Sequence, residues 1–184
     1  MVDDIFSTLA AHMVKGLMIH EQLMHCFSFI GLDGYAKCHE YHYISETKGY
    51  INLCRYYLDH YRRLIKPSQI DVPDIIPATW YDTSMLNVDP QTRVKAVKAA
   101  LEEWIEWERS AVHAYEKACG ELFGLGEYGA FQFIEMYLID TKDELKIARD
   151  EFLHKSMIEF DMVSIHEEQS DLKDKYEKLL KKVY

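Results

Sequence analysis

The sequence lacks the patterns that would place it in several common classes of protein. No stretch alternates apolar and polar residues as a half-buried strand does, and no repeat or low-complexity tract is present. Of the 4 prolines, all but one fall between residues 66 and 89, a stretch with no helical period. The 4 cysteines stand singly without a Cys-x-x-Cys pair. This spacing argues against a disulfide framework or a zinc site and favours a reducing compartment.

Long apolar runs and an excess of positive charge are also missing. No run approaches the roughly 18–20 apolar residues that span a bilayer, and the start, residues 1–4, lacks the basic residues of a secretory signal. We therefore expect a cytoplasmic protein with no membrane contact. The formal net charge of −10 disfavours nucleic-acid binding, because the acidic protein and the phosphate backbone would repel each other.

Apolar residues recur at helical spacing in four long segments. We predict helices over about residues 3–30, 35–65, 89–122 and 127–158. Either Asp3 or Asp4 can cap the first helix, and the Asp89-Pro90 pair is typical of a helix start. A last amphipathic helix is predicted from Ser164, with Glu167 completing a capping box.

These segments predict one helical domain. Residues 1–160 would form a four-helix bundle, in which the short turn after residue 30 folds the second helix back antiparallel to the first. The stretch 66–89 would be a long crossover that makes the second and third helices parallel. Residues 161–184 would form a C-terminal helix that packs on the bundle or on a neighbouring subunit.

Three glutamates lie on the apolar stripes of different predicted helices, and they carry the functional prediction. They are Glu46, Glu108 and Glu144. A buried carboxylate is costly unless it is paired, neutralised or bound to a metal, so we predict a cation between them, with His20 as a further ligand. Oxygen-rich ligation suits iron, manganese, magnesium or calcium, and a nearby imidazole favours a transition metal. Alternatively, protonation or partners such as His20, His42 or Lys48 neutralise the three carboxylates.

Other residues allow secondary interpretations. Histidines three apart share a helix face, so His39 and His42 form a possible second chelate, although helical histidine pairs are commoner as ordinary polar residues. His42 alone is better placed as a hydrogen-bond partner or replacement ligand for Glu46. The aromatic residues Trp104 and Tyr115, like Tyr137, would be electron-transfer residues beside a metal centre or, more simply, core packing.

Three strings in the sequence carry a family resemblance. They are Gly31-Leu-Asp-Gly-Tyr-Ala-Lys37, Trp107-Glu-Arg109, and Gly126-Glu-Tyr128 followed by Phe133-Ile-Glu-Met-Tyr-Leu138. In this order and spacing they resemble the ferritin-like superfamily, and non-haem bacterial ferritins most of all, over roughly residues 5–157. The resemblance implies an all-α ferritin-like four-helix bundle of two antiparallel pairs, which forms homo-oligomers.

The resemblance also implies a modified iron site. Glu46 matches the glutamate that bridges both irons, and Glu108 and Glu144 match carboxylates of the second iron. Three other ligand positions differ from the ferritin pattern: Met13 replaces a glutamate, Gly49 a histidine and Thr141 a glutamine. In addition, His20 stands where ferritins have a tyrosine beside the irons. The implied function is binding of iron or a similar divalent metal, with Fe(II) oxidation and iron storage. The alternatives are a non-catalytic scaffold that acts by self-association or partner binding and, less well supported, a DNA-protecting mini-ferritin.

Overall fold

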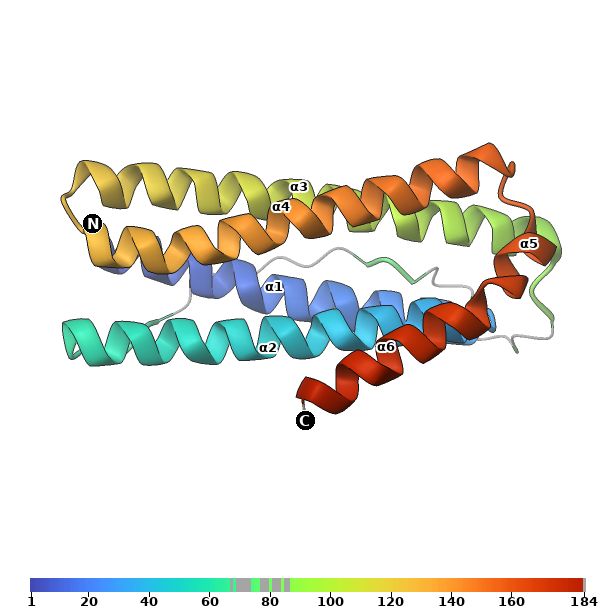
Figure 1. The fold of residues 1–184 in the computed structure, drawn as a ribbon, viewed down its shortest axis with the longest axis horizontal. Coiled ribbons are helices and arrows are strands. Elements are labelled where there is room, and N and C mark those ends of the chain that lie inside the picture. The colour runs from blue at the N-terminus through green and yellow to red at the C-terminus, as the bar shows by residue number, and fades with distance from the viewer. Residues whose placement is uncertain (67, 69–73, 77–79, 81–83, 85–86, 184) are drawn as a thin grey trace.

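The computed structural model describes residues 1–66, 68, 74–76, 80, 84 and 87–183. The described residues form six helical segments and no strand. These are α1 (Val2–Phe29), α2 (Asp33–Tyr61), α3 (Pro90–Gly124), α4 (Tyr128–Met157), α5 (Met162–Glu167) and α6 (Gln169–Val183). Figure 1 shows α1 paired with α2 and α3 paired with α4, and the two pairs lie side by side with their long axes roughly aligned. The predicted all-α four-helix bundle with an added C-terminal helix is confirmed.

Most helix boundaries follow from local signals in the sequence. The Asp89 side chain accepts a hydrogen bond from the Thr92 amide at 3.0 Å and caps α3, as predicted. The turns before α2 and α4 need positive φ, and glycine occupies both positions: Gly31 at 77° and Gly126 at 76°. No helix in the described part of the chain is long and apolar enough to cross a membrane.

Three predicted boundaries are wrong. The first helix begins at Val2, so Asp3 and Asp4 lie in its first turn rather than at its cap. The second helix ends at Tyr61, because Arg62 adopts a left-handed conformation (φ 56°) that stops it four residues early. The last helix does not begin at Ser164. Instead Asp161 caps the short α5 by accepting a hydrogen bond from the Ser164 amide at 2.9 Å, and α6 follows.

The core lies where α1 packs against α2 and α3. Its largest fully buried side chains include Phe6, Phe27, Trp104 and Tyr35. The predicted crossover 66–89 lies largely outside the described residues. Within its described part, Trp80 is buried and stacks on Phe29 at a centroid distance of 4.9 Å.

The C-terminal helix α6 packs along α2 of the same chain, and its start approaches α2 very closely. A Cβ placed on Gly34 would lie 2.7 Å from the backbone oxygen of Gln169. The Gln169 side chain also accepts a hydrogen bond from the Tyr35 amide at 3.2 Å, which satisfies a free donor in the first turn of α2. No side chain adjacent to the turn caps α2, so a residue remote in sequence performs this task.

Gly34→Ala should therefore destabilise the protein. The new methyl group would meet backbone atoms that cannot rotate away, so α6 must shift, and we expect a loss of about 1–3 kcal/mol in the free energy of unfolding. Gly120→Ala is the matched control, because no atom of the part of the chain that the structure describes lies within 4 Å of a Cβ at this helical position. It should stabilise the protein by about 0.5–1 kcal/mol. Urea denaturation of both variants measures the free energy of unfolding. Equal changes of this free energy in Gly34→Ala and Gly120→Ala would contradict the prediction.

Candidate functional site

A polar pocket of about 530 Å³ lies between α2 and α4, and the end of α6 forms part of its wall. Acidic, basic and aromatic side chains share its surface, so it is built for a polar or charged ligand rather than an apolar one. The lining residues from α2 are Tyr41, His42, Ser45, Glu46, Lys48, Gly49 and Asn52, and those from α3, α4 and α6 are Tyr115, Tyr137, Asp140, Thr141, Asp143, Glu144 and Lys182.

The three predicted glutamates come together at this pocket, but at different depths. Glu46 and Glu144 line the pocket and are partly buried, whereas Glu108 lies behind them and is only 1% exposed. The Glu46 carboxylate lies against α1, since a Cβ on Gly16 would be 3.1 Å from its Oε1 atom. The expected full burial therefore holds for Glu108 alone.

Glu46 carries a strongly perturbed carboxyl group at the wall of the pocket. Burial raises the pKa of its carboxyl from 4.5 to about 8; the charge of Glu144 adds to this effect, and His42 opposes it. A proton therefore remains on this carboxyl near neutral pH unless a cation replaces it.

His42 supplies a cation next to Glu144. Its Nδ1 atom lies 3.3 Å from Oε1 of Glu144, whose side chain is 27% exposed. Burial alone would lower the pKa of His42, but Glu144 and then Cys38 outweigh it and raise the pKa well above 6.5. The pair is therefore an imidazolium and a carboxylate at the wall of the pocket.

Glu108 and His20 form the inner part of the site. Trp104 donates its indole N–H to Oε1 of Glu108 at 3.0 Å. Burial raises the pKa of Glu108 well above 4.5, with the charges of Glu144 and Glu46 adding to the rise. Burial also lowers the pKa of His20. The 3.8 Å between His20 Nε2 and Glu108 Oε1 is too long for a hydrogen bond, and with both groups neutral it is not an ion pair.

The histidines predicted as a second chelate both point into the bundle. His39 shares a hydrogen bond of 3.1 Å between its Nδ1 atom and that of His20, and burial lowers its pKa as well. The three imidazole rings of His20, His39 and His42 lie 5.1–6.2 Å apart between centroids. Among the described residues, nothing forms a hydrogen bond with the buried Nε2 atoms of His39 and His42. Sequence reasoning missed this cluster because helical spacing says nothing about which histidines meet across helices.

The positions that differ from the ferritin ligand pattern also meet in space. A Cβ on Gly49 would lie 3.4 Å from the Tyr137 ring and 3.7 Å from the methyl group of Met13. Apolar atoms thus fill the space beside Glu46 where the resemblance places further ligands. Thr141 is buried at the edge of the same pocket.

Within residues 1–66, 87–183 and the few others described, no three His, Cys, Asp or Glu side chains are arranged to hold one metal ion. The polar groups of the site bond to one another instead, Glu144 to His42 and Glu108 to Trp104. Chemically, the site can hold and release protons, at Glu46 and at the His42–Glu144 pair, and it presents carboxyl oxygens to an open pocket.

Comparisons with solved structures identify the architecture. The open-pore ferritin of the hyperthermophilic archaeon Archaeoglobus fulgidus superimposes with a TM-score of 0.75 at 13% identity, covering 94% of both chains. This chain has the ferritin-like fold. A humanized archaeal ferritin gives a TM-score of 0.76 at 14% identity, with coverage of 94% of this chain and 93% of that one. A variant of the protein PmFTN, in a crystal soaked in iron, gives 0.73 at 8% identity, with 92% and 96% covered.

The likeness is one of shape and not of sequence. No protein-family model matches the sequence of this ferritin-like chain, and no curated protein does. At such low identities the shared fold says nothing by itself about retained chemistry. The function must therefore be argued from the pocket.

Proposed function

We propose that this ferritin-like protein binds a divalent transition-metal ion, iron or manganese, at the pocket wall formed by Glu46 and Glu144. Glu108 would supply a further oxygen from behind, and His42 or His20 a nitrogen. The observation that carries the proposal is that Glu46 of α2 and Glu144 of α4 line one pocket, and that Glu108 of α3 lies close enough to feel the charges of both. The pKa values of Glu46 and Glu108 are both raised, chiefly by burial. Raised carboxyl pKa values reflect a shortage of positive charge that a cation would relieve.

The residues present fit such an ion in their chemistry, although they are not arranged around one. Hard carboxylate oxygens with one or two imidazoles suit iron or manganese. For Glu144 to bind a metal, it would have to exchange its His42 partner for the ion. We therefore propose a single weak site in which the ion is cargo or a substrate; Fe(II) held there would be open to oxidation by O2 or peroxide.

Elemental analysis after loading tests the proposal. The purified protein is dialysed to equilibrium against Fe(II) without oxygen, or against Mn(II), and the bound metal is measured beside Glu46→Gln/Glu144→Gln. We expect on the order of one ion per chain at saturation, and at least about tenfold weaker binding in the double variant. The matched control is Glu106→Gln/Glu116→Gln, which removes two exposed carboxyl groups outside the pocket. Equal metal content in all three proteins would refute the assignment.

A non-catalytic ferritin-like scaffold is the second candidate, and one observation favours it. Two of the three glutamates already have partners, Glu144 in His42 and Glu108 in Trp104, and Met13 and Tyr137 fill the space beside Gly49. If the parent protein binds no metal, this result favours the scaffold function over the metal-binding function.

We further propose that the protein is cytoplasmic and self-associates through α4. Apolar side chains more than half exposed lie along this helix at Met136, Ile139, Leu153 and Met157, and soluble monomers seldom expose so many in a row. Light scattering of the purified protein measures the assembly directly, and a monomeric mass would end this part of the proposal.

A further inference from the structure

The second half of α6 covers two reactive side chains of α2. Tyr176 is 4% exposed, and its ring lies 5.8 Å from that of Tyr41 and 6.4 Å from that of His42, between centroids. Cys38, one helical turn before His42, is 2% exposed. Burial and the contact with Cys38 raise the pKa of the Tyr176 phenol, so this hydroxyl stays protonated against the thiol.

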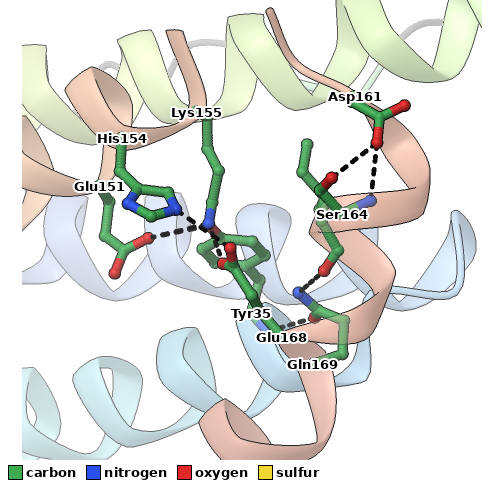
Figure 2. Close-up of polar contacts among 9 residues, drawn as sticks. Tyr35, Glu151, His154, Lys155, Asp161, Ser164, Glu168 and Gln169 are labelled. Carbon is green, nitrogen blue, oxygen red and sulfur yellow. Dashed lines mark hydrogen bonds and ion pairs between the residues drawn. The ribbon is translucent and has the colours of Figure 1, made fainter. Parts of the chain in front are cut away.

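The beginning of the same segment is held by polar contacts around the buried Lys155, which Figure 2 shows. Lys155 of α4 is 1% exposed and pairs with Glu168, which also lies 3.0 Å from Nε2 of His154. Glu151 lies 3.9 Å from the Lys155 ammonium and accepts a hydrogen bond from the Tyr35 hydroxyl at 2.9 Å. These contacts tie the junction of α5 and α6 to both α2 and α4.

The two halves of α6 are thus held by different forces. The ion pairs to Lys155 and His154 lie at its start, and the pair between Lys173 and Asp33 lies one turn further on. Beyond that point the contacts with α2 are mainly those of one apolar stripe, with Tyr176 and Leu180 buried and Lys181 and Lys182 exposed. The polar additions are the contact of the Tyr176 phenol with Cys38 and the charge of Glu177, which acts on Lys37. A terminal helix held mainly by one apolar stripe is the kind of element that opens locally without global unfolding.

We propose that α6 is a hinged cover, fixed at Glu168 and Gln169, whose second half lifts to expose Cys38 and His42. In the closed position Tyr176 shields both side chains, and Lys182 narrows the pocket that Glu46 and Glu144 line. Lifting the cover widens this pocket and gives solvent a path to the His42 side of the Glu144 pair. The inference rests on α6 alone and holds whether or not the pocket binds metal.

Thiol labelling resolved by cysteine tests the cover. The full-length protein is reacted with N-ethylmaleimide, and the modified fraction of each cysteine is followed by peptide mass spectrometry. Cys26 on α1 and Cys119 on α3 are also buried, and α6 packs mainly against α2 and α5 rather than against these helices, so the two cysteines serve as references for opening elsewhere in the bundle. In Tyr176→Ala we expect Cys38 to react about 10- to 100-fold faster than in the parent, with Cys26 and Cys119 unchanged. Phe123→Ala, at an exposed aromatic residue, should leave all rates unchanged.

A second measurement on the unmodified protein covers the case in which Tyr176→Ala loosens the whole bundle. The labelling rate of each cysteine is measured in increasing urea below the unfolding transition. Opening of α6 exposes little surface, so the rate at Cys38 should depend weakly on urea, whereas Cys26 and Cys119 should show the steep dependence of global unfolding. Equal slopes at all three cysteines, or no acceleration of Cys38 in a folded Tyr176→Ala variant, would overturn the proposal.

Discussion

Glu46→Gln should stabilise the protein by several kcal/mol at pH 9 and by less than about 1 kcal/mol at pH 5. Burial raises the pKa of Glu46 to about 8, against 4.5 in the unfolded chain. Between these two values the folded state binds more protons than the unfolded state, so stability falls as pH rises from 4.5 to 8. At about 1.4 kcal/mol per pKa unit, the difference sets an upper limit of about 5 kcal/mol above pH 8. A glutamine has the same shape and never ionises, so it escapes this loss.

Thermal or urea unfolding at several pH values between 4 and 9 measures the effect. Glu106→Gln is the matched control, since Glu106 lies on α3 and its side chain is 64% exposed. Its stability relative to the parent should change little with pH. If the parent and Glu46→Gln show parallel pH profiles, the Glu46 carboxyl is not held neutral in the folded protein.

Glu168→Ala is expected to have the largest effect on stability away from the pocket. Among the described residues it leaves the ammonium of Lys155 with Glu151 as its nearest carboxylate, at 3.9 Å. Removing one partner of a fully buried ion pair typically costs about 3–5 kcal/mol. Because the Glu168 side chain is 42% exposed, water reaches the pair more easily and we expect a smaller cost of about 2–4 kcal/mol. For a chain of this size, this corresponds to a drop of roughly 4–16 °C in the midpoint of thermal unfolding.

Lys173→Ala is the contrasting case, because it breaks an exposed ion pair. The side chain of Lys173 is 41% exposed, and that of its partner Asp33 is 59% exposed. Exposed pairs contribute less than about 1 kcal/mol. The double variant Lys155→Met/Glu168→Leu should recover most of the stability lost in Glu168→Ala, since no unpaired charge remains buried. If it is as unstable as the single variant, the buried charge is not the cause.

Local signals account for how well the long helices could be predicted. The Asp89-Pro90 pair fixes the start of α3, and Gly31 and Gly126 supply the positive φ values that the turns need. The predicted start of the C-terminal helix at Ser164 was wrong because two overlapping patterns compete there. Ser164 and Glu167 resemble a capping box, but Asp161 lies three residues earlier and its side chain takes the Ser164 amide.

The site was harder to predict because periodicity places a side chain on a face without naming its partner. The helical period predicted that Glu46, Glu108 and Glu144 point into the bundle. In the structure Glu46 and Glu144 line one pocket, and Glu108 is buried near them. The helical period could not choose among His20, His42 and Lys48 as partners, whereas the structure pairs His42 with Glu144. The covering of His42 by Tyr176 depends on how α6 docks, which no local pattern in α2 reveals.

The distant cap of α2 has a consequence for the order in which the chain can fold during synthesis. The amide of Tyr35 bonds to a side chain 134 residues further along, and at about 5–20 residues per second that segment leaves the ribosome many seconds after α2 does. Until then the α1–α2 hairpin has an unsatisfied first turn and an uncovered apolar face beside Cys38. We therefore expect nascent chains stalled before Gln169 to depend on chaperones more than chains stalled after α6 has emerged.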